Sequence, residues 1–296
     1  MTCGVAILIA IETGNGHAEP LSARAPAIEV VLASRSLQPG ELVVVTLTFA
    51  SEPADVRVTA FGKMFPAFTA GERERRALVG IDVEQRPGKY ELAVSARLSS
   101  GAVRETQPLV VLPKKFATRA LRVSPDFVNP PAAVQERIAR EARLISHAYG
   151  DSVSERLWDA PFTRPVPDPQ NSAFGQRSVF NGTPRSPHGG ADFASPAGTP
   201  IKAPNAGRIL LAEDLFFTGT TVIIDHGLGL FSTLAHLSRL DVHQGDTVTA
   251  GQVIGLVGAT GRVTGPHLHW ALRVSGARVD PLAALTLLGP PVASPR

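Results

Sequence analysis

The sequence has 296 residues, which is long enough for two domains that each have a core of their own. An apolar fraction of 44% argues against a disordered chain. The net charge of +3, without a cluster of Lys and Arg among aromatic residues, gives no nucleic-acid-binding footprint, so we expect no nucleic-acid partner. The single cysteine, Cys3, excludes an intrachain disulfide and a cysteine-rich zinc site.

The chain begins with a short apolar run over residues 3–11, about the length of the hydrophobic region of a signal peptide. A small-residue cleavage site lies near Ala18, but no Lys or Arg precedes Arg24. Either the start is clipped or the leader is unusual, and we expect residues 1–18 to be a signal peptide. The run is too short to span a bilayer, and no other segment is apolar for long enough, so we expect no transmembrane segment.

Residues 25–115 have the pattern of short strands. Between residues 89 and 98 apolar and polar residues alternate, which is typical of a strand buried on one face. Further strands are expected at 42–49 and 56–60, with turns at 38–40, 51–53 and 86–88. This spacing predicts an immunoglobulin-like β-sandwich. It contains no histidine and no clustered acid pair, which favours a spacer or docking module over a second catalytic unit.

Residues 116–173 are expected to form a linker with one helix. Asn129 is the predicted N-cap, Pro130 and Pro131 fit the first turn, and Gly150 marks the end. The apolar residues of the helix recur on one face: Val134, Ile138, Leu144 and Ile145. The proline-rich stretch 161–169 then predicts an extended connection.

From residue 174 onward the sequence has valine-rich strands, glycine turns and most of the histidines. Six of the eight histidines lie between His188 and His269. His267 and His269 fall in a predicted strand, where residues i and i+2 point to one face about 6.5–7 Å apart. His188 and Asp192 are separated by Gly189 and Gly190, which favour a turn that enters a strand and lets the backbone approach a ligand.

Two histidines and a carboxylate are a common catalytic zinc set that leaves a fourth position for water or substrate. A bound water then has a pKa of about 7. Spacing alone does not decide whether His267 and His269 share one metal, or one binds metal while its neighbour handles protons. A lone histidine such as His236 is uninformative by itself.

These motifs resemble the lysostaphin/LytM-type zinc metallopeptidases of the M23 family. The resemblance covers roughly residues 174–285 and rests on His188-x-x-x-Asp192 together with His267-Leu268-His269. Other segments match in order: 197–201, 222–227, 245–248, 251–255 and 260–266.

The resemblance implies that His188, Asp192 and His269 bind one Zn²⁺ ion and that His236 and His267 are the catalytic histidines. It implies a compact antiparallel β-sheet peptidase domain over residues 174–288. The chain as a whole is then mainly β. The implied activity is hydrolysis of peptide cross-links in bacterial peptidoglycan through a zinc-activated water, in an exported protein of the periplasm or cell wall.

Some positions depart from the family pattern or take a structural interpretation. Leu234 stands where many members have an aromatic residue, and Trp270-Ala271 replaces Phe-Glu, which affects the expected substrate preference more than metal binding. His226 is expected to be structural and His243 to be exposed.

Three functions other than a peptidase fit parts of the sequence. The first is a catalytically silent LytM-type activator of a cell-wall amidase, but all five zinc and catalytic positions are filled. The second is a biotin or lipoyl carrier, which needs a lysine at a hairpin tip, whereas the last lysine is Lys202. The third, a plain wall-binding module, leaves the histidines unexplained. A regulatory partner of the N-terminal domain and an inhibitory cover over residues 161–186 stay open.

Overall fold

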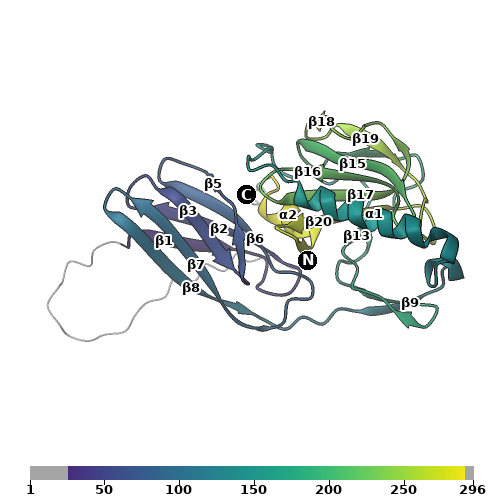
Figure 1. Cartoon of the computed structure of the whole chain (residues 1–296), viewed down its shortest axis with the longest axis horizontal. Helices are drawn as coiled ribbons and strands as arrows, with labels where there is room; N and C mark the ends of the chain where they lie inside the picture. The colour runs from purple at the N-terminus through teal and green to yellow at the C-terminus, as the bar shows by residue number, and fades with distance from the viewer. Residues whose placement is uncertain (1–25, 291–296) are drawn as a thin grey trace, which may run out of the picture.

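Figure 1 shows the computed structural model, which describes residues 26–290, so the expected signal peptide lies outside the described residues. The elements of the N-terminal part are β1 (Ile28–Ala33), β2 (Leu42–Phe49), β3 (Ala54–Ala60), β4 (Lys63–Phe65), β5 (Ala67–Thr69), β6 (Glu74–Gly80), β7 (Gly88–Leu98) and β8 (Gly101–Val111). The connection to the C-terminal part holds β9 (Thr118–Leu121), the 3-10 helix η1 (Pro125–Phe127) and α1 (Ala132–Gly150).

The C-terminal part is built from short strands and one terminal helix. Its elements are β10 (Gln170–Ser172), β11 (Arg177–Phe180), β12 (Thr183–Pro184), β13 (Gly190–Phe193), β14 (Pro200–Lys202), β15 (Gly207–Leu215), β16 (Gly219–Asp225), β17 (Leu230–Leu240), β18 (Thr247–Val248), β19 (Val253–Val257), β20 (Leu268–Val274), β21 (Ala277–Val279) and α2 (Pro281–Leu287). The chain is therefore mainly β, as predicted. No helix among the described residues is long and apolar enough to cross a membrane.

The N-terminal part is a sandwich of two antiparallel four-stranded sheets. Their strand orders are β1-β2-β6-β5 and β4-β3-β7-β8, which is the immunoglobulin arrangement. Alternating residues of β7 point into the shared core, where Leu92 and Val94 are almost fully buried. Near the start of β7 the Tyr90 hydroxyl donates a hydrogen bond of 2.8 Å to the carbonyl of Arg86, as in the tyrosine corner of such folds. The predicted immunoglobulin-like sandwich is confirmed.

The C-terminal part is organised around one antiparallel sheet of ten strands, called the large sheet here. The order of its main strands is β10-β13-β20-β17-β16-β15-β18. Of the other three strands, β14 pairs with β19, β19 also pairs with β17, and β21 pairs with β20. Trp270 of β20 and Phe193 of β13 are fully buried in its core. Leu144, Ile145 and Tyr149 of α1 pack against a cluster from β15, β16 and β17, so that α1 runs across the outside of these strands (Figure 1).

The start of α1 differs from the prediction. The helix begins at Ala132 with Pro131 as N-cap and without a side-chain capping hydrogen bond, so Asn129 is not its cap. Pro131 itself takes the N-cap position in an extended conformation, with φ −56° and ψ 153°, and Asn129 lies two residues upstream of that position. The predicted end at Gly150 is confirmed.

The proline-rich stretch after α1 is not extended throughout as predicted, because it bends over residues 165–168, and it packs along the C-terminal part. Phe162 and Val166 are buried, and the amide of Phe162 donates to the carbonyl of Leu288. The amide of Lys202 donates to the carbonyl of Pro165. β10 then joins the large sheet beside β13. This stretch therefore packs against and extends the sheet that carries the histidines.

The sandwich is docked firmly on the large sheet. Leu42 and Leu78, on its outer face, share a buried apolar cluster with Leu272 and Val274 of β20. The chain that leaves the sandwich continues as β9, which pairs in parallel with β11 in a separate three-stranded sheet, β12-β11-β9. Residues far upstream of the histidines are thereby brought beside them.

Candidate metal and active site

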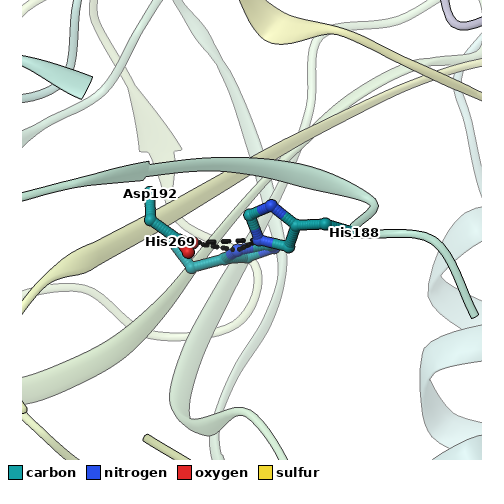
Figure 2. A group of neighbouring side chains, drawn as sticks. All are labelled: His188, Asp192 and His269. Atoms are coloured by element: carbon teal, nitrogen blue, oxygen red, sulfur yellow. Dashed lines mark hydrogen bonds and ion pairs between the residues drawn. The ribbon is translucent and has the colours of Figure 1, made fainter. Parts of the chain in front are cut away.

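His188, Asp192 and His269 converge at the junction of β13 and β20. Asp192 and His269 are direct partners in the antiparallel pairing of these two strands, and His188 precedes β13. Figure 2 shows the three side chains pointing at one another. Nε2 of His188 lies 3.0 Å from Nδ1 of His269 and 3.0 Å from Oδ1 of Asp192, and the third separation, from His269 Nδ1 to Asp192 Oδ1, is 2.9 Å.

This donor set fits a small divalent cation. It is the one group of three or more metal-type ligands found within residues 26–290. The donors of a tetrahedral zinc site, with bonds of about 2.0–2.1 Å, lie about 3.3 Å apart, so the observed triangle needs only a slight expansion. Nδ1 of His188 donates to the carbonyl of Ala173 at 3.1 Å, which leaves Nε2 as the ligand atom.

The electrostatics of the triangle keep the Asp192 carboxylate charged and favour a neutral His269. Burial acts to raise the pKa of Asp192, but hydrogen bonds from His188 and His269 outweigh burial and hold that pKa well below its usual range. Burial lowers the pKa of His269 despite its contact with Asp192. A neutral imidazole and an ionised carboxylate are the forms that bind metal.

His236 and His267 also lie next to the triangle formed by His188, Asp192 and His269. The two rings lie 4.8 Å apart between centroids, and Nε2 of His267 is 3.8 Å from Oδ1 of Asp192. Nδ1 of His236 donates to the carbonyl of Thr260 and Nδ1 of His267 to that of Gly265, both at 2.9 Å. Each histidine therefore presents Nε2 to the site. Burial, followed by the nearby His269 and His267, lowers the pKa of His236 to about 3.

The position of His236 depends on an irregularity in β17. The register between β16 and β17 shifts there, and His236 has a positive φ of 70°. A bulge of this kind re-aims a side chain that regular alternation would point elsewhere. Such backbone strain costs about 1–3 kcal/mol and often accompanies a functional side chain.

A groove of about 580 Å³ runs over these histidines. Its walls include three arginines that sequence reasoning did not single out: Arg119 on β9, Arg185 and Arg262. Nη2 of Arg119 lies 3.7 Å from Oδ2 of Asp192. The segment around Arg119 contains no histidine and no motif, so nothing in the sequence indicated it. Arg262 lies inside the matched stretch 260–266, which was the available signal.

The two remaining histidines of the region have the environments expected of them. His226 is fully buried, with Nδ1 donating to the carbonyl of Ala206 at 2.7 Å and Nε2 accepting from the Ser232 hydroxyl at 2.9 Å. Trp270 Nε1 donates to the same hydroxyl oxygen at 3.2 Å. His243 has a side chain that is 93% exposed. Neither reaches the groove.

Sequence and structure comparisons assign the family. Residues 186–281 match the sequence model of peptidase family M23. The chain is similar to the crystal structure of a putative peptidase M23 from Pseudomonas aeruginosa, with 35% sequence identity and a TM-score of 0.65. That match covers 84% of this chain and 95% of the other. The overall fold is thus shared over most of both chains. The protein belongs to peptidase family M23.

Curated relatives match over about a third of this chain. The chain is 42% identical over 115 residues to the peptidoglycan DD-endopeptidase ShyA of Vibrio cholerae, covering 38% of this chain and 27% of that protein. It is 44% identical over 96 residues to the DD-carboxypeptidase/endopeptidase Mpg of Neisseria meningitidis, covering 32% of this chain and 22% of that protein. The matched part spans about a quarter of the length of these relatives.

Proposed function

We propose that the protein is a zinc-dependent endopeptidase that hydrolyses peptide cross-links of bacterial peptidoglycan. His188, Asp192 and His269 are the proposed metal ligands, and His236 and His267 the proposed catalytic residues. The observation that supports this most directly is the convergence of all five side chains on one groove, with three donor atoms 2.9–3.0 Å apart.

In this proposal some residues hold the metal ion and others transfer protons. When bound, zinc supplies a Lewis acid that polarises a peptide carbonyl and makes water more acidic. His188, Asp192 and His269 fix its place, while backbone carbonyls fix the tautomers of His236 and His267. With Nε2 directed into the groove, these two rings can take a proton from the attacking water and return it to the leaving amine.

The substrate class and location are supported by the relatives. Two of them are named for endopeptidase activity, and one of these names specifies peptidoglycan. Such a substrate lies outside the cytoplasmic membrane, which agrees with the expected signal peptide and with a periplasmic or wall-associated protein. In this proposal residues 174–288, together with β10, form the peptidase unit, and the sandwich serves as a docking module that can receive a regulatory partner.

The catalytically silent activator is the weaker proposal. Such a protein has no need of metal ligands or proton-transfer groups. Here the three proposed ligands and the two proposed catalytic histidines all line one groove. This complete set favours an enzyme.

The test uses the full chain without residues 1–18, incubated with peptidoglycan sacculi with and without a zinc chelator. Released muropeptides are analysed by mass spectrometry, and the His236→Ala variant is run alongside. We expect chelator-sensitive conversion of cross-linked dimers to monomers, lost in the variant. Stoichiometric zinc binding without any release of muropeptides would contradict the proposal and favour the activator.

A further inference from the structure

Arginines without carboxylate partners gather at the groove beside the histidines. Arg185 and Arg262 both line it, and no ion pair is found for either within residues 26–290. Paired arginines elsewhere, such as Arg35 with Glu41 and Arg278 with Asp82, show the more usual environment. Two half-buried guanidinium groups without a counterion need a separate explanation.

Arg262 is held in place by aromatic rings. Its guanidinium carbon lies 4.8 Å from the ring centroid of Phe180 and 5.0 Å from that of Phe217. The backbone amide of Arg262 donates to the carbonyl of Phe217 at 2.8 Å, which anchors the loop. These contacts fix the plane of the guanidinium group, and its side-chain N–H groups make no hydrogen bond to other described residues. Stacking of this kind pre-organises an arginine for a planar anion.

Arg185 is anchored in a complementary way. Its Nη2 donates to the carbonyl of Val128 at 2.8 Å, while Nε is buried without a hydrogen-bond partner. Burial and then the positive charge of Arg185 lower the pKa of Arg262. Two like charges are thus held near each other in a partly desolvated place, an arrangement that an anion bound to both would relieve.

The charge balance of the groove supports an anionic ligand. Its lining includes three arginines but one acidic residue, Asp192. Asp192 lies in the metal triangle and next to Arg119, so it does not neutralise the other two arginines. A bound divalent cation would make the groove more positive still.

We propose that Arg185 and Arg262 form a subsite for a carboxylate of the substrate peptide. This inference rests on the proposed endopeptidase function. A guanidinium group binds a carboxylate through two parallel N–H donors, which suits a planar, charged group on the peptide. Because Arg185 and Arg262 line the same groove as the five histidine and aspartate side chains of the site, the carboxylate is expected on a residue near the scissile bond.

The experiment compares two synthetic cross-linked peptides that differ in one group. One carries a free carboxylate on the residue next to the scissile bond, and the other a carboxamide. Zinc-loaded wild type is compared with Arg262→Gln, Arg262→Lys and Arg185→Gln, and with Arg104→Gln as a matched control. Arg104 has a side chain that is 69% exposed on the sandwich. Thermal unfolding shows that each variant is folded.

We expect KM for the carboxylate peptide to rise about 10- to 100-fold in Arg262→Gln and Arg185→Gln, because a charge-assisted hydrogen bond is lost. For the carboxylate peptide, kcat should change little, and so should KM for the carboxamide peptide. Arg262→Lys should recover part of the loss in KM, and Arg104→Gln should behave as wild type. Binding of both peptides to the zinc-loaded His236→Ala variant, with and without Arg262→Gln, is measured by calorimetry. The calorimetry should show tighter binding of the carboxylate peptide than of the carboxamide peptide, and Arg262→Gln should remove this preference.

Failure of the subsite and failure of the proposed function give different results. If wild type releases muropeptides from sacculi but treats the two peptides alike, the subsite is overturned and the endopeptidase stands. If the carboxylate peptide binds preferentially through Arg262 but no peptide bond is cut, the subsite stands and the endopeptidase is overturned. Equal binding of both peptides without cleavage overturns both.

Discussion

His236 and His269 lie in one groove, but different contacts hold them. Nδ1 of His269 lies 2.9 Å from Oδ1 of Asp192 and 3.0 Å from Nε2 of His188. Nδ1 of His236 instead donates a hydrogen bond to the carbonyl of Thr260. In the proposed function, this difference separates His269, a proposed metal ligand, from His236, a proposed proton-transfer group. It can be tested because the two kinds of loss have separate readouts.

We expect His269→Ala to lose bound zinc, measured by elemental analysis after dialysis, and with it all activity. His236→Ala should retain zinc and lose about 10²–10⁴-fold in kcat, because a positioned acid/base is removed. His243→Ala, at a 93% exposed side chain, is the control and should match wild type. Loss of zinc from His236→Ala would show that His236 is a ligand instead.

His226 gives a pH dependence of stability away from the groove. Burial lowers its pKa to about 4, although the Ala206 carbonyl and Asp225 act in the opposite direction. Because the pKa of an unfolded histidine is about 6.5, the unfolded chain takes up a proton first as pH falls. The stability from neutral His226 is complete above about pH 6.5 and is lost progressively down to about pH 4. The loss amounts to about 3 kcal/mol.

The measurement is chemical denaturation between pH 7 and pH 4 of chelator-treated wild type, His226→Gln and the exposed control His243→Gln. We expect His226→Gln to be less stable at pH 7 but to lose less stability on acidification than wild type. Equal slopes for wild type and His226→Gln would show that His226 does not carry this dependence. Titration of the other histidines is common to all three proteins and drops out of the comparison.

At the scale of elements, the two glycines between His188 and Asp192 have different roles. Gly190 opens β13 and lies against β20, so that an added Cβ would overlap the carbonyl oxygen of Trp270 and come within 2.7 Å of Cε1 of His269. An added Cβ on Gly189 would meet only Cδ of Arg278, at 4.0 Å. Neither glycine has a positive φ. Close approach of two strands, rather than a bend, explains Gly190.

We therefore expect Gly190→Ala to displace the His269 ring and weaken zinc binding by about 10- to 100-fold, as loss of a positioning contact around a metal site does. Gly189→Ala, the matched control, should bind zinc nearly as wild type does. Competition with a zinc-binding dye measures both affinities. Equal affinities for the two variants would show that the strands can separate enough to accept a methyl group.

At the scale of the whole molecule, the sandwich and the large sheet are joined by an apolar cluster and by ion pairs. Arg278 on β21 donates to both carboxylate oxygens of Asp82, at 2.7 and 3.1 Å, and its backbone amide donates to the same residue. Burial acts to raise the pKa of Asp82, but these hydrogen bonds outweigh burial and lower it. β21 pairs with β20, which carries His269, so this junction supports the strand that bears a proposed ligand.

We expect Asp82→Asn to lower the free energy of unfolding by about 2 kcal/mol, less than for a fully buried pair because these side chains are about a quarter exposed. Glu91→Gln removes the partner of Arg104 in a pair that is more than half exposed, and should change stability by less than about 1 kcal/mol. Urea denaturation measures both. A larger loss for Glu91→Gln than for Asp82→Asn would contradict this view of the junction.

The sequence by itself determined the local features. Alternation over residues 89–98 predicted a strand with one buried face, and β7 has it, because side-chain direction in a strand is a local property. The spacing of His267 and His269, and of His188 and Asp192, likewise placed these pairs near one another. The family resemblance then selected His188, Asp192 and His269 as ligands, and the structure brings these three together.

Tertiary structure alone decided how distant segments meet. The bulge that turns His236 toward the groove is a mismatch between β16 and β17, so it depends on a pairing that neither strand encodes by itself. Arg119 reaches Asp192 because β9 pairs with β11. Asn129 fails as a cap because the extended Pro131 takes the N-cap position. Residue spacing records which side chains share a strand face, but long-range pairing and packing decide which strands share a site.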